Sequence, residues 1–247
     1  MVIKEIQAKS ILSKSQVYDY ALNAYVGCQH ACTYCYAAFM KRFTGHLEPW
    51  GSFVDVKTNA PILLAPEVRR KKRGSVWVSG VCDAYQPVER RYELTRQCLE
   101  ILVEHEWPVR IQTKSPLVLR DIDILKGSRD VEVGFTITTA DEQLRRIFEP
   151  GAPPVSKRIE ALSMLHAEGI KTFVMVAPLL PHNESLAGLL KGRVNHALID
   201  RYNYHYADSI YRKQNMEWAK TDDFFTQEGE KLREAFEQAG IPCEILY

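Results

Sequence analysis

Three cysteines lie within eight residues near the start of the chain, at Cys28, Cys32 and Cys35. Their C-x3-C-x2-C arrangement follows an apolar run of strand length, so it falls on a loop. Thiolate sulfur is a soft ligand that suits iron–sulfur clusters or zinc. The spacing therefore indicates a metal centre, although three buried structural thiols would leave the same pattern.

The number of ligands separates the two kinds of metal site. A structural zinc site normally takes four protein ligands. Here the fourth would have to be His30, His46 or a distant cysteine, and the chain has no second paired-ligand half. A [4Fe–4S] cluster held by three cysteines leaves one iron open for a small ligand. The incomplete ligand set therefore favours a cluster with chemistry at its open iron.

The composition is that of a globular protein without a strong charge bias. The chain has 247 residues, 46% of them hydrophobic and 26% charged, with a net charge of +1. This length allows one sizeable core. The six cysteines are too few for a disulfide-stapled secreted domain, and no stretch approaches the length of a membrane span. We expect a soluble cytoplasmic protein with no membrane partner. The near-neutral net charge does not indicate a polyanionic partner, although it allows a local basic face.

Apolar, β-branched runs alternate with segments of helical period along most of the chain. Strands are predicted over residues 20–26, 76–81, 109–113, 131–138, 171–177 and 194–199, and helices over 61–70, 90–106, 121–126, 141–148, 157–168 and 226–239. Such alternation predicts the α/β class with a parallel sheet and right-handed crossovers. About six βα units predict a partial (β/α)6 TIM-like barrel, with a doubly wound sheet as the alternative.

We expect a single domain over residues 1–247, with a core barrel over about 11–203 and a C-terminal extension over 204–247. In either fold the functional groups should lie at the carboxyl ends of the strands. Cys98 falls on the apolar face of a predicted helix and Cys243 in a predicted last strand, so both are interpreted as core residues.

The cysteine spacing resembles the signature of the radical S-adenosylmethionine (SAM) superfamily. The resemblance implies a [4Fe–4S] cluster on Cys28, Cys32 and Cys35 whose open iron binds SAM. It implies that one electron then splits SAM into methionine and a 5′-deoxyadenosyl radical, which abstracts hydrogen from a substrate. It also implies a reducing electron donor of the flavodoxin or ferredoxin kind. Tyr34, the aromatic residue before the third cysteine, would lie beside the adenine.

Further motifs make the chain similar to the spore photoproduct lyase-like group, also called DNA repair photolyase-like. The similarity extends from about residue 11 to 203. It is carried by Asn23-Ala-Tyr-Val-Gly-Cys28, Tyr34-Cys35-Tyr36, Gly80-Val-Cys-Asp83-Ala-Tyr-Gln-Pro-Val-Glu89, Thr113-Lys-Ser115 with Arg120-Asp121, and Val176-Ala177-Pro178. In spore photoproduct lyase a lysine matching Lys114 pairs with the SAM carboxylate, so the resemblance implies that role here.

Polar residues follow the predicted strands where a SAM site is expected. Asp83 suits the SAM ammonium, or it caps the helix that follows, and Cys82 would face the same cavity. Thr136 could serve the ribose or carboxylate, with Thr138 as its competitor. Ala177 would offer its backbone to the adenine, or it is an ordinary residue of the barrel rim.

One position departs from the lyase pattern. Where spore photoproduct lyase has its hydrogen-donating cysteine, this chain has Gly80, and Cys82 lies two residues further on. Tyr36 matches a tyrosine implicated in radical relay. The thymine-dimer reaction is therefore not carried over. A hydrogen relay through Cys82 or Tyr36 is one hypothesis, and Cys82 as an inert small hydrophobe is the other.

The substrate is left open by the sequence, as is the oligomeric state. Residues 195–206 interleave aromatic, Arg and His side chains, which can stack on bases or close the barrel mouth. The first hypothesis is a radical SAM enzyme acting on a nucleic acid, by lesion repair or base modification. The second is one acting on a protein, peptide or small metabolite. The third is a non-catalytic, cysteine-ligated metal-binding protein.

Overall fold

The computed structural model describes all 247 residues as a mixed α/β fold with two sheets. The smaller sheet consists of β1 (Val2–Ile6), β5 (Phe53–Lys57) and β4 (Tyr25–Val26). The larger sheet has eight strands in the order β11 (Cys243–Ile245), β10 (His196–Ile199), β9 (Lys171–Val176), β8 (Val131–Thr136), β7 (Val109–Thr113), β6 (Val76–Val78), β3 (Tyr20–Leu22) and β2 (Leu12–Lys14).

The larger sheet is parallel from β3 to β11, and only β2 pairs antiparallel with its neighbour. All six residues of β8 are buried, as expected for a parallel strand that is covered on both faces. The strand order ends at β2 and β11 without pairing them. The predicted α/β class, with a parallel sheet built as a partial barrel, is confirmed.

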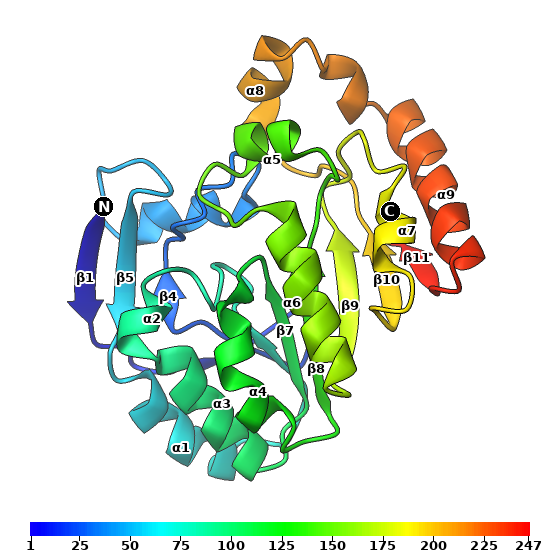
Figure 1. Cartoon of the computed structure of the whole chain (residues 1–247). Coiled ribbons are helices and arrows are strands. Elements are labelled where there is room, and N and C mark those ends of the chain that lie inside the picture. Colours follow the sequence, from blue (N-terminus) through cyan, green and yellow to red (C-terminus); the bar gives the residue numbers. More distant parts are fainter.

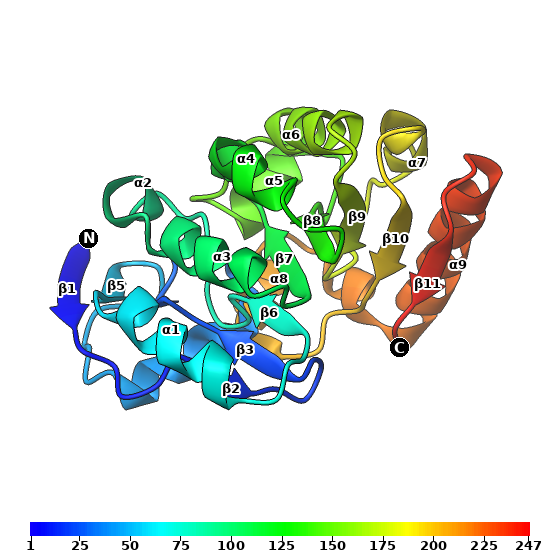
Figure 2. The ribbon, with the colours of Figure 1, turned by 90° about the horizontal axis from the view of Figure 1, so that it is seen from below.

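Helices follow most of the parallel strands. They are α1 (Ala60–Arg70), α2 (Glu89–Tyr92), α3 (Leu94–Glu104), α4 (Ile122–Leu125), α5 (Glu142–Phe148), α6 (Val155–Ala167), α7 (Leu186–Leu190), α8 (Asp208–Lys213) and α9 (Asp222–Gln238), with 3-10 helices at Tyr36–Phe43, Pro116–Asp121, His205–Ala207 and Glu217–Lys220. Helix α1 packs on α3, α3 on α4, and α6 on β8 and β9. They form a layer along one side of the strands (Figures 1 and 2). None of the helices has the length and apolar character needed to cross a bilayer.

The first predicted strand, residues 20–26, is divided between the two sheets. Its first half, β3, pairs in the larger sheet, and its second half, β4, pairs with β5. Asn23 lies at the break, where its side-chain oxygen accepts a hydrogen bond from the Val81 N–H at 3.0 Å. The chain thereby leaves the larger sheet just before the cysteines. At the break, Asn23 is hydrogen-bonded to the loop that follows β6.

Two helix predictions differ from the structure in detail. The predicted helix over 90–106 is broken between α2 and α3 at Glu93, whose φ of 52° is left-handed. The predicted helix over 121–126 is shorter, at Ile122–Leu125, and the side chain of Asp121 before it makes no capping bond. The fully buried carboxylate accepts hydrogen bonds from Arg96 and Arg120 instead.

One hydrophobic cluster of 55 buried residues joins the two sheets and the helices. It includes Val54 and Val56 of the smaller sheet, Cys98 of α3 and Phe236 of α9. Cys98 is therefore a core residue, and Cys243 is packed against the same cluster. The assignment of residues 1–247 to a single domain stays a prediction, with which this shared core agrees.

Candidate functional site

The cysteine loop, defined as residues 27–35, leaves β4 through a turn that requires glycine. Gly27 has a φ of +89°, and a Cβ built on it would lie 2.3 Å from the Phe53 carbonyl oxygen. Only glycine tolerates both the left-handed conformation and this close approach. The loop therefore starts from a fixed contact with β5, and Cys28 follows directly.

The three thiols of the loop lie in surroundings that disfavour a bare thiolate. Burial raises the pKa of all three, for Cys32 to about 12 even though the charge of Lys114 opposes the rise. The buried Trp50 Nε1 makes no hydrogen bond of normal geometry, although its side chain partly opposes the rise in the pKa of Cys35. Thiolates at Cys28, Cys32 and Cys35 thus need a nearby positive group, which cluster iron supplies.

The two histidines that could complete a zinc site, His30 and His46, already contact carboxylates. His30 Nε2 lies 3.2 Å from the Asp83 carboxylate. The ring nitrogens of His46 lie 3.1 Å from Glu48 and 2.8 Å from Asp55. No three His, Cys, Asp or Glu side chains converge closely enough to hold one metal ion. A [4Fe–4S] cluster does not need that convergence, because each thiolate binds a different iron atom. The donor set therefore fits a cluster better than zinc.

The last residue of α5 and the turn after it, residues 148–151, pack directly on the cysteine loop. The Thr33 N–H donates to the first carbonyl of this segment at 2.8 Å, and the Gly151 N–H donates to the His30 carbonyl at 2.9 Å. Figure 1 shows α5 at the end of the sheet to which the arrow of β9 points. These contacts bring Glu149 to the inner side of the loop.

The Glu149 carboxylate is fully buried and contacts three side chains. Its Oε1 accepts hydrogen bonds from the Tyr34 hydroxyl and, at 3.1 Å, from Thr138. Its Oε2 lies 2.5 Å from Nη2 of Arg158, whose side chain is also fully buried. Burial acts to raise the pKa of Glu149, but the charges of Arg158 and Lys114 lower it overall. Glu149 is therefore ionised and paired with Arg158.

Lys114, directly after β7, carries an ammonium group that no partner fully satisfies. Its Nζ lies 4.0 Å from Glu149 Oε1, which is too long for a hydrogen bond, and 5.6 Å from the centre of the Tyr34 ring. Burial lowers the pKa of Lys114, but the charges of Cys32 and Glu149 raise it overall, so the amine is charged. Its side chain is 14% exposed. A cation with free donors thus lies beside the cysteine loop.

Asp83, which follows β6, is surrounded by donors from the protein. Its Oδ1 accepts hydrogen bonds from the Thr113 hydroxyl at 2.7 Å and the Tyr85 N–H at 2.8 Å. Its Oδ2 accepts from the Lys114 N–H at 2.8 Å and lies 3.2 Å from His30. Burial raises the pKa of Asp83, but His30 and the hydrogen bonds lower it far below its usual value. Asp83 therefore fixes the backbone of Lys114, and its contact with the SAM ammonium stays a prediction.

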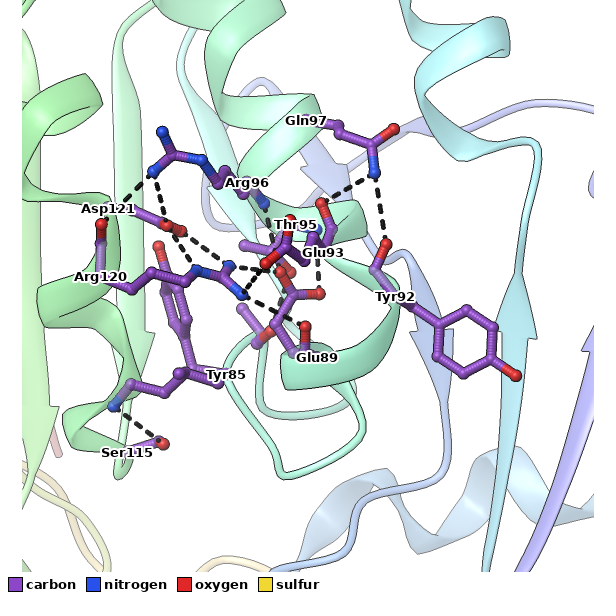
Figure 3. Close-up of polar contacts among 12 residues, drawn as sticks. Tyr85, Glu89, Tyr92, Glu93, Thr95, Arg96, Gln97, Ser115, Arg120 and Asp121 are labelled. Carbon is purple, nitrogen blue, oxygen red and sulfur yellow. Dashed lines mark hydrogen bonds and ion pairs between the residues drawn. The ribbon is translucent and has the colours of Figure 1, made fainter.

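A second buried network joins the loop after β6 to the loop after β7 (Figure 3). Arg120 donates hydrogen bonds to Glu89 at 2.8 Å and to Asp121 at 2.7 Å. Glu89 also accepts from the hydroxyl of Tyr25 on β4, just before the cysteine loop. These residues come from the motifs that the sequence singled out. They hold together the two loops that carry the predicted SAM ligands.

Cys82 and Tyr36, the two candidates for hydrogen transfer, both contact the turn after β6. The Cys82 thiol is 3.5 Å from the Ser79 hydroxyl, and burial raises its pKa to about 12. The Tyr36 hydroxyl donates to the Gly80 carbonyl, and its ring stacks on Tyr204 at a centroid distance of 5.8 Å. Both side chains are therefore protonated and near the cysteine loop.

The two remaining predicted SAM contacts lie at strand ends, as expected. Thr136 ends β8, and its hydroxyl accepts a hydrogen bond from Gln112 at 3.0 Å. Its competitor Thr138 is engaged with Glu149. Ala177 follows β9 and is partly exposed. Their roles toward SAM stay predictions.

Sequence reasoning missed Glu149 and Arg158. Glu149 belongs to the short turn after α5, and Arg158 belongs to a helix whose periodicity suggested only packing. Charged residues in such places are usually solvated. Only the contact between the turn and the cysteine loop, which are more than a hundred residues apart, reveals the site they form.

Comparison with known protein families identifies the family to which this site belongs. The family model described as the radical SAM superfamily matches residues 22–190, which include the cysteine loop and the ends of β6 to β9. The chain belongs to the radical SAM superfamily. It is a radical SAM enzyme of a family that uses SAM and an iron–sulfur cluster.

Two similar proteins are described as uncharacterized. One, from Methanocaldococcus jannaschii, is 39% identical over 181 residues, which cover 72% of this chain and 68% of the relative. Another, from Mycobacterium tuberculosis (strain ATCC 25618 / H37Rv), is 33% identical over 190 residues, which cover 72% of this chain and 56% of the relative. The match therefore spans only about half to two-thirds of these radical SAM relatives.

Solved structures confirm the fold of this radical SAM chain. A spore photoproduct lyase mutant superposes with a TM-score of 0.74 and 16% identity over 99% of this chain and 82% of the lyase. Streptococcus suis SuiB bound to S-adenosylmethionine superposes with a TM-score of 0.58 and 14% identity over 92% of this chain and 50% of SuiB. The predicted spore photoproduct lyase-like architecture is confirmed.

Proposed function

We propose that this protein binds SAM at a [4Fe–4S] cluster held by Cys28, Cys32 and Cys35, and cleaves it reductively. The observation that carries the proposal is the Lys114 ammonium, a buried cation with free donors beside three thiols. A single carboxylate in front of it would satisfy that cation. The carboxylate of SAM, chelated at the open iron, is such a group.

The chain's own residues can bind and orient the methionine and adenine ends of SAM. Lys114 would pair with the carboxylate, and the Tyr34 ring, fixed through its hydroxyl by Glu149, would bound the adenine. Asp83, Thr136 and Ala177 would complete the pocket from the ends of β6, β8 and β9. When bound, the cluster supplies the electron that breaks a carbon–sulfur bond of SAM. A small flavin or iron–sulfur protein is the electron donor we expect.

The substrate that we favour is a nucleic acid, because aromatic and basic side chains adjoin the cysteine loop on the surface. Phe43 and Tyr204 are 68% and 54% exposed. The Arg42 guanidinium lies 4.8 Å from the centre of the Phe43 ring, and Tyr204 stacks on Tyr36. Exposed aromatic rings, one of them beside an arginine, suit stacking on single-stranded or flipped bases. A protein, peptide or small metabolite remains the alternative class.

The experiment that tests the proposal is anaerobic reconstitution with iron and sulfide. We expect about four irons and four sulfides per chain, lost when any of Cys28, Cys32 or Cys35 is replaced by alanine. Cys98→Ala is the matched control, because that thiol is buried in the core away from the loop. Stoichiometric zinc without sulfide, or full iron content in the three loop variants, would contradict the proposal.

A further inference from the structure

Three charged side chains lie together beside the cysteine loop, and only two of them are in close contact. Arg158 lies 2.5 Å from Glu149, and both side chains are fully buried. Lys114 is the third, at 4.0 Å from the same carboxylate. Arg158 also donates to the carbonyls of Pro153 and Thr136, so protein acceptors hold its guanidinium in place.

The fixed guanidinium decides which cation Glu149 pairs with. Two cations compete for one carboxylate, and Arg158 makes the close contact. Without Arg158, the Glu149 carboxylate would be left buried with a single cation within reach, and a buried uncompensated charge is strongly unfavourable. Nζ of Lys114 would have to move by only about 1 Å to reach normal hydrogen-bond distance.

We propose that Arg158 is a positioning residue that neutralises Glu149 and thereby keeps the Lys114 ammonium free for an anionic group. This inference rests on the proposed function, in which that group is the SAM carboxylate. Arg158 does not touch the ligand itself, and it acts through the pairing of Glu149. A cation engaged with Glu149 would have to break that pair before it could bind SAM.

The test compares SAM affinity among four reconstituted proteins: wild type, Arg158→Met, Glu149→Gln and the double variant. We expect Arg158→Met to bind SAM at least about tenfold more weakly, with unchanged iron and sulfide content. Glu149→Gln should bind SAM more tightly than Arg158→Met does, because no carboxylate then competes for Lys114. The double variant should regain most of the loss, since no carboxylate remains to capture Lys114.

The recovery distinguishes a charge effect from simple damage to the fold. Arg146→Met is the matched control, because Arg146 is 72% exposed and lies on the neighbouring helix. A second readout uses the cluster-free proteins: acylation of the Lys114 amine, followed by mass spectrometry, should be slower in Arg158→Met than in wild type. If Arg158→Met proves too unstable to purify, the SAM affinity of the double variant is compared with that of wild type instead.

Two outcomes would overturn the inference. The first is wild-type SAM affinity in Arg158→Met. The second is a double variant that binds SAM at least as weakly as Arg158→Met does. If only the double variant folds, the contradicting result is a SAM affinity more than about tenfold lower than that of wild type. Failure of the proposed function looks different, because reconstituted wild type would then bind no SAM in the same assay.

Discussion

Replacing Asp83 should destabilise this protein more than any surface substitution. The carboxylate is 7% exposed, accepts hydrogen bonds from Thr113, Tyr85 and Lys114, and lies 3.2 Å from Nε2 of His30. Removing one partner of a buried, hydrogen-bonded charge costs about 3–5 kcal/mol. We expect Asp83→Ala to lose that much of the free energy of unfolding, a large part of the roughly 5–15 kcal/mol of a typical domain.

The isosteric change should cost less and should depend on pH. In Asp83→Asn one oxygen still accepts, but the amide group meets the Lys114 N–H with a donor, and we expect a loss of about 2–3 kcal/mol. The folded protein lowers the pKa of Asp83. Its stabilisation is therefore fully present above the ordinary aspartate pKa of about 4 and lost as the pH falls through the folded pKa. The difference between wild type and Asp83→Asn should shrink at acid pH.

Urea unfolding of the cluster-free proteins, followed by tryptophan fluorescence, measures these differences. Asp141→Ala is the control, because that carboxylate caps α5 by accepting from the N–H groups of Gln143 and Leu144. Loss of such a cap costs about 1 kcal/mol. If Asp83→Ala proved no more destabilising than Asp141→Ala, the role given to Asp83 in fixing the loop after β7 would be refuted.

Three further predictions concern the site. Lys114→Met should keep the cluster but bind SAM at least about tenfold more weakly, as measured by equilibrium dialysis. Unchanged affinity would show that Lys114 does not contribute to the SAM pocket. If Cys82 or Tyr36 returns hydrogen to the product, the Cys82→Ala or Tyr36→Phe protein should still form 5′-deoxyadenosine but with a lower ratio of product to 5′-deoxyadenosine. An unchanged ratio in both variants would exclude both side chains from hydrogen transfer. Tyr204→Ala should weaken binding of single-stranded DNA by about 1–3 kcal/mol in fluorescence anisotropy, and wild-type binding would argue for another substrate class.

The sequence predicted the fold because its signals are local. The predicted strands over 76–81, 109–113, 131–138, 171–177 and 194–199 correspond to β6 to β10, which are rich in apolar or β-branched residues. Gly169 ends α6 in the left-handed conformation that glycine tolerates. The break of residues 20–26 was not visible, because β3 and β4 are both apolar and differ only in the sheet they join.

The candidate site was predictable only in part. Cysteine spacing and strand ends located Cys28, Cys32, Cys35 and the region of Lys114, since a loop motif and a βα boundary are local features. The pairing of Glu149 with Arg158 was not predictable, because it depends on a turn that packs on a loop far away in the chain. The sequence also did not show that Asp83 would be surrounded by protein donors.

We propose that the three loop cysteines and Lys114 form a site for reductive cleavage of SAM. The most direct measurement is 5′-deoxyadenosine formed by the reconstituted protein with SAM and dithionite under anaerobic conditions, quantified by liquid chromatography and mass spectrometry. We predict formation that requires the cluster and is abolished in Cys28→Ala, Cys32→Ala and Cys35→Ala but retained in Cys98→Ala. A wild-type protein with a full complement of iron and sulfide that binds SAM but forms no 5′-deoxyadenosine would contradict the account.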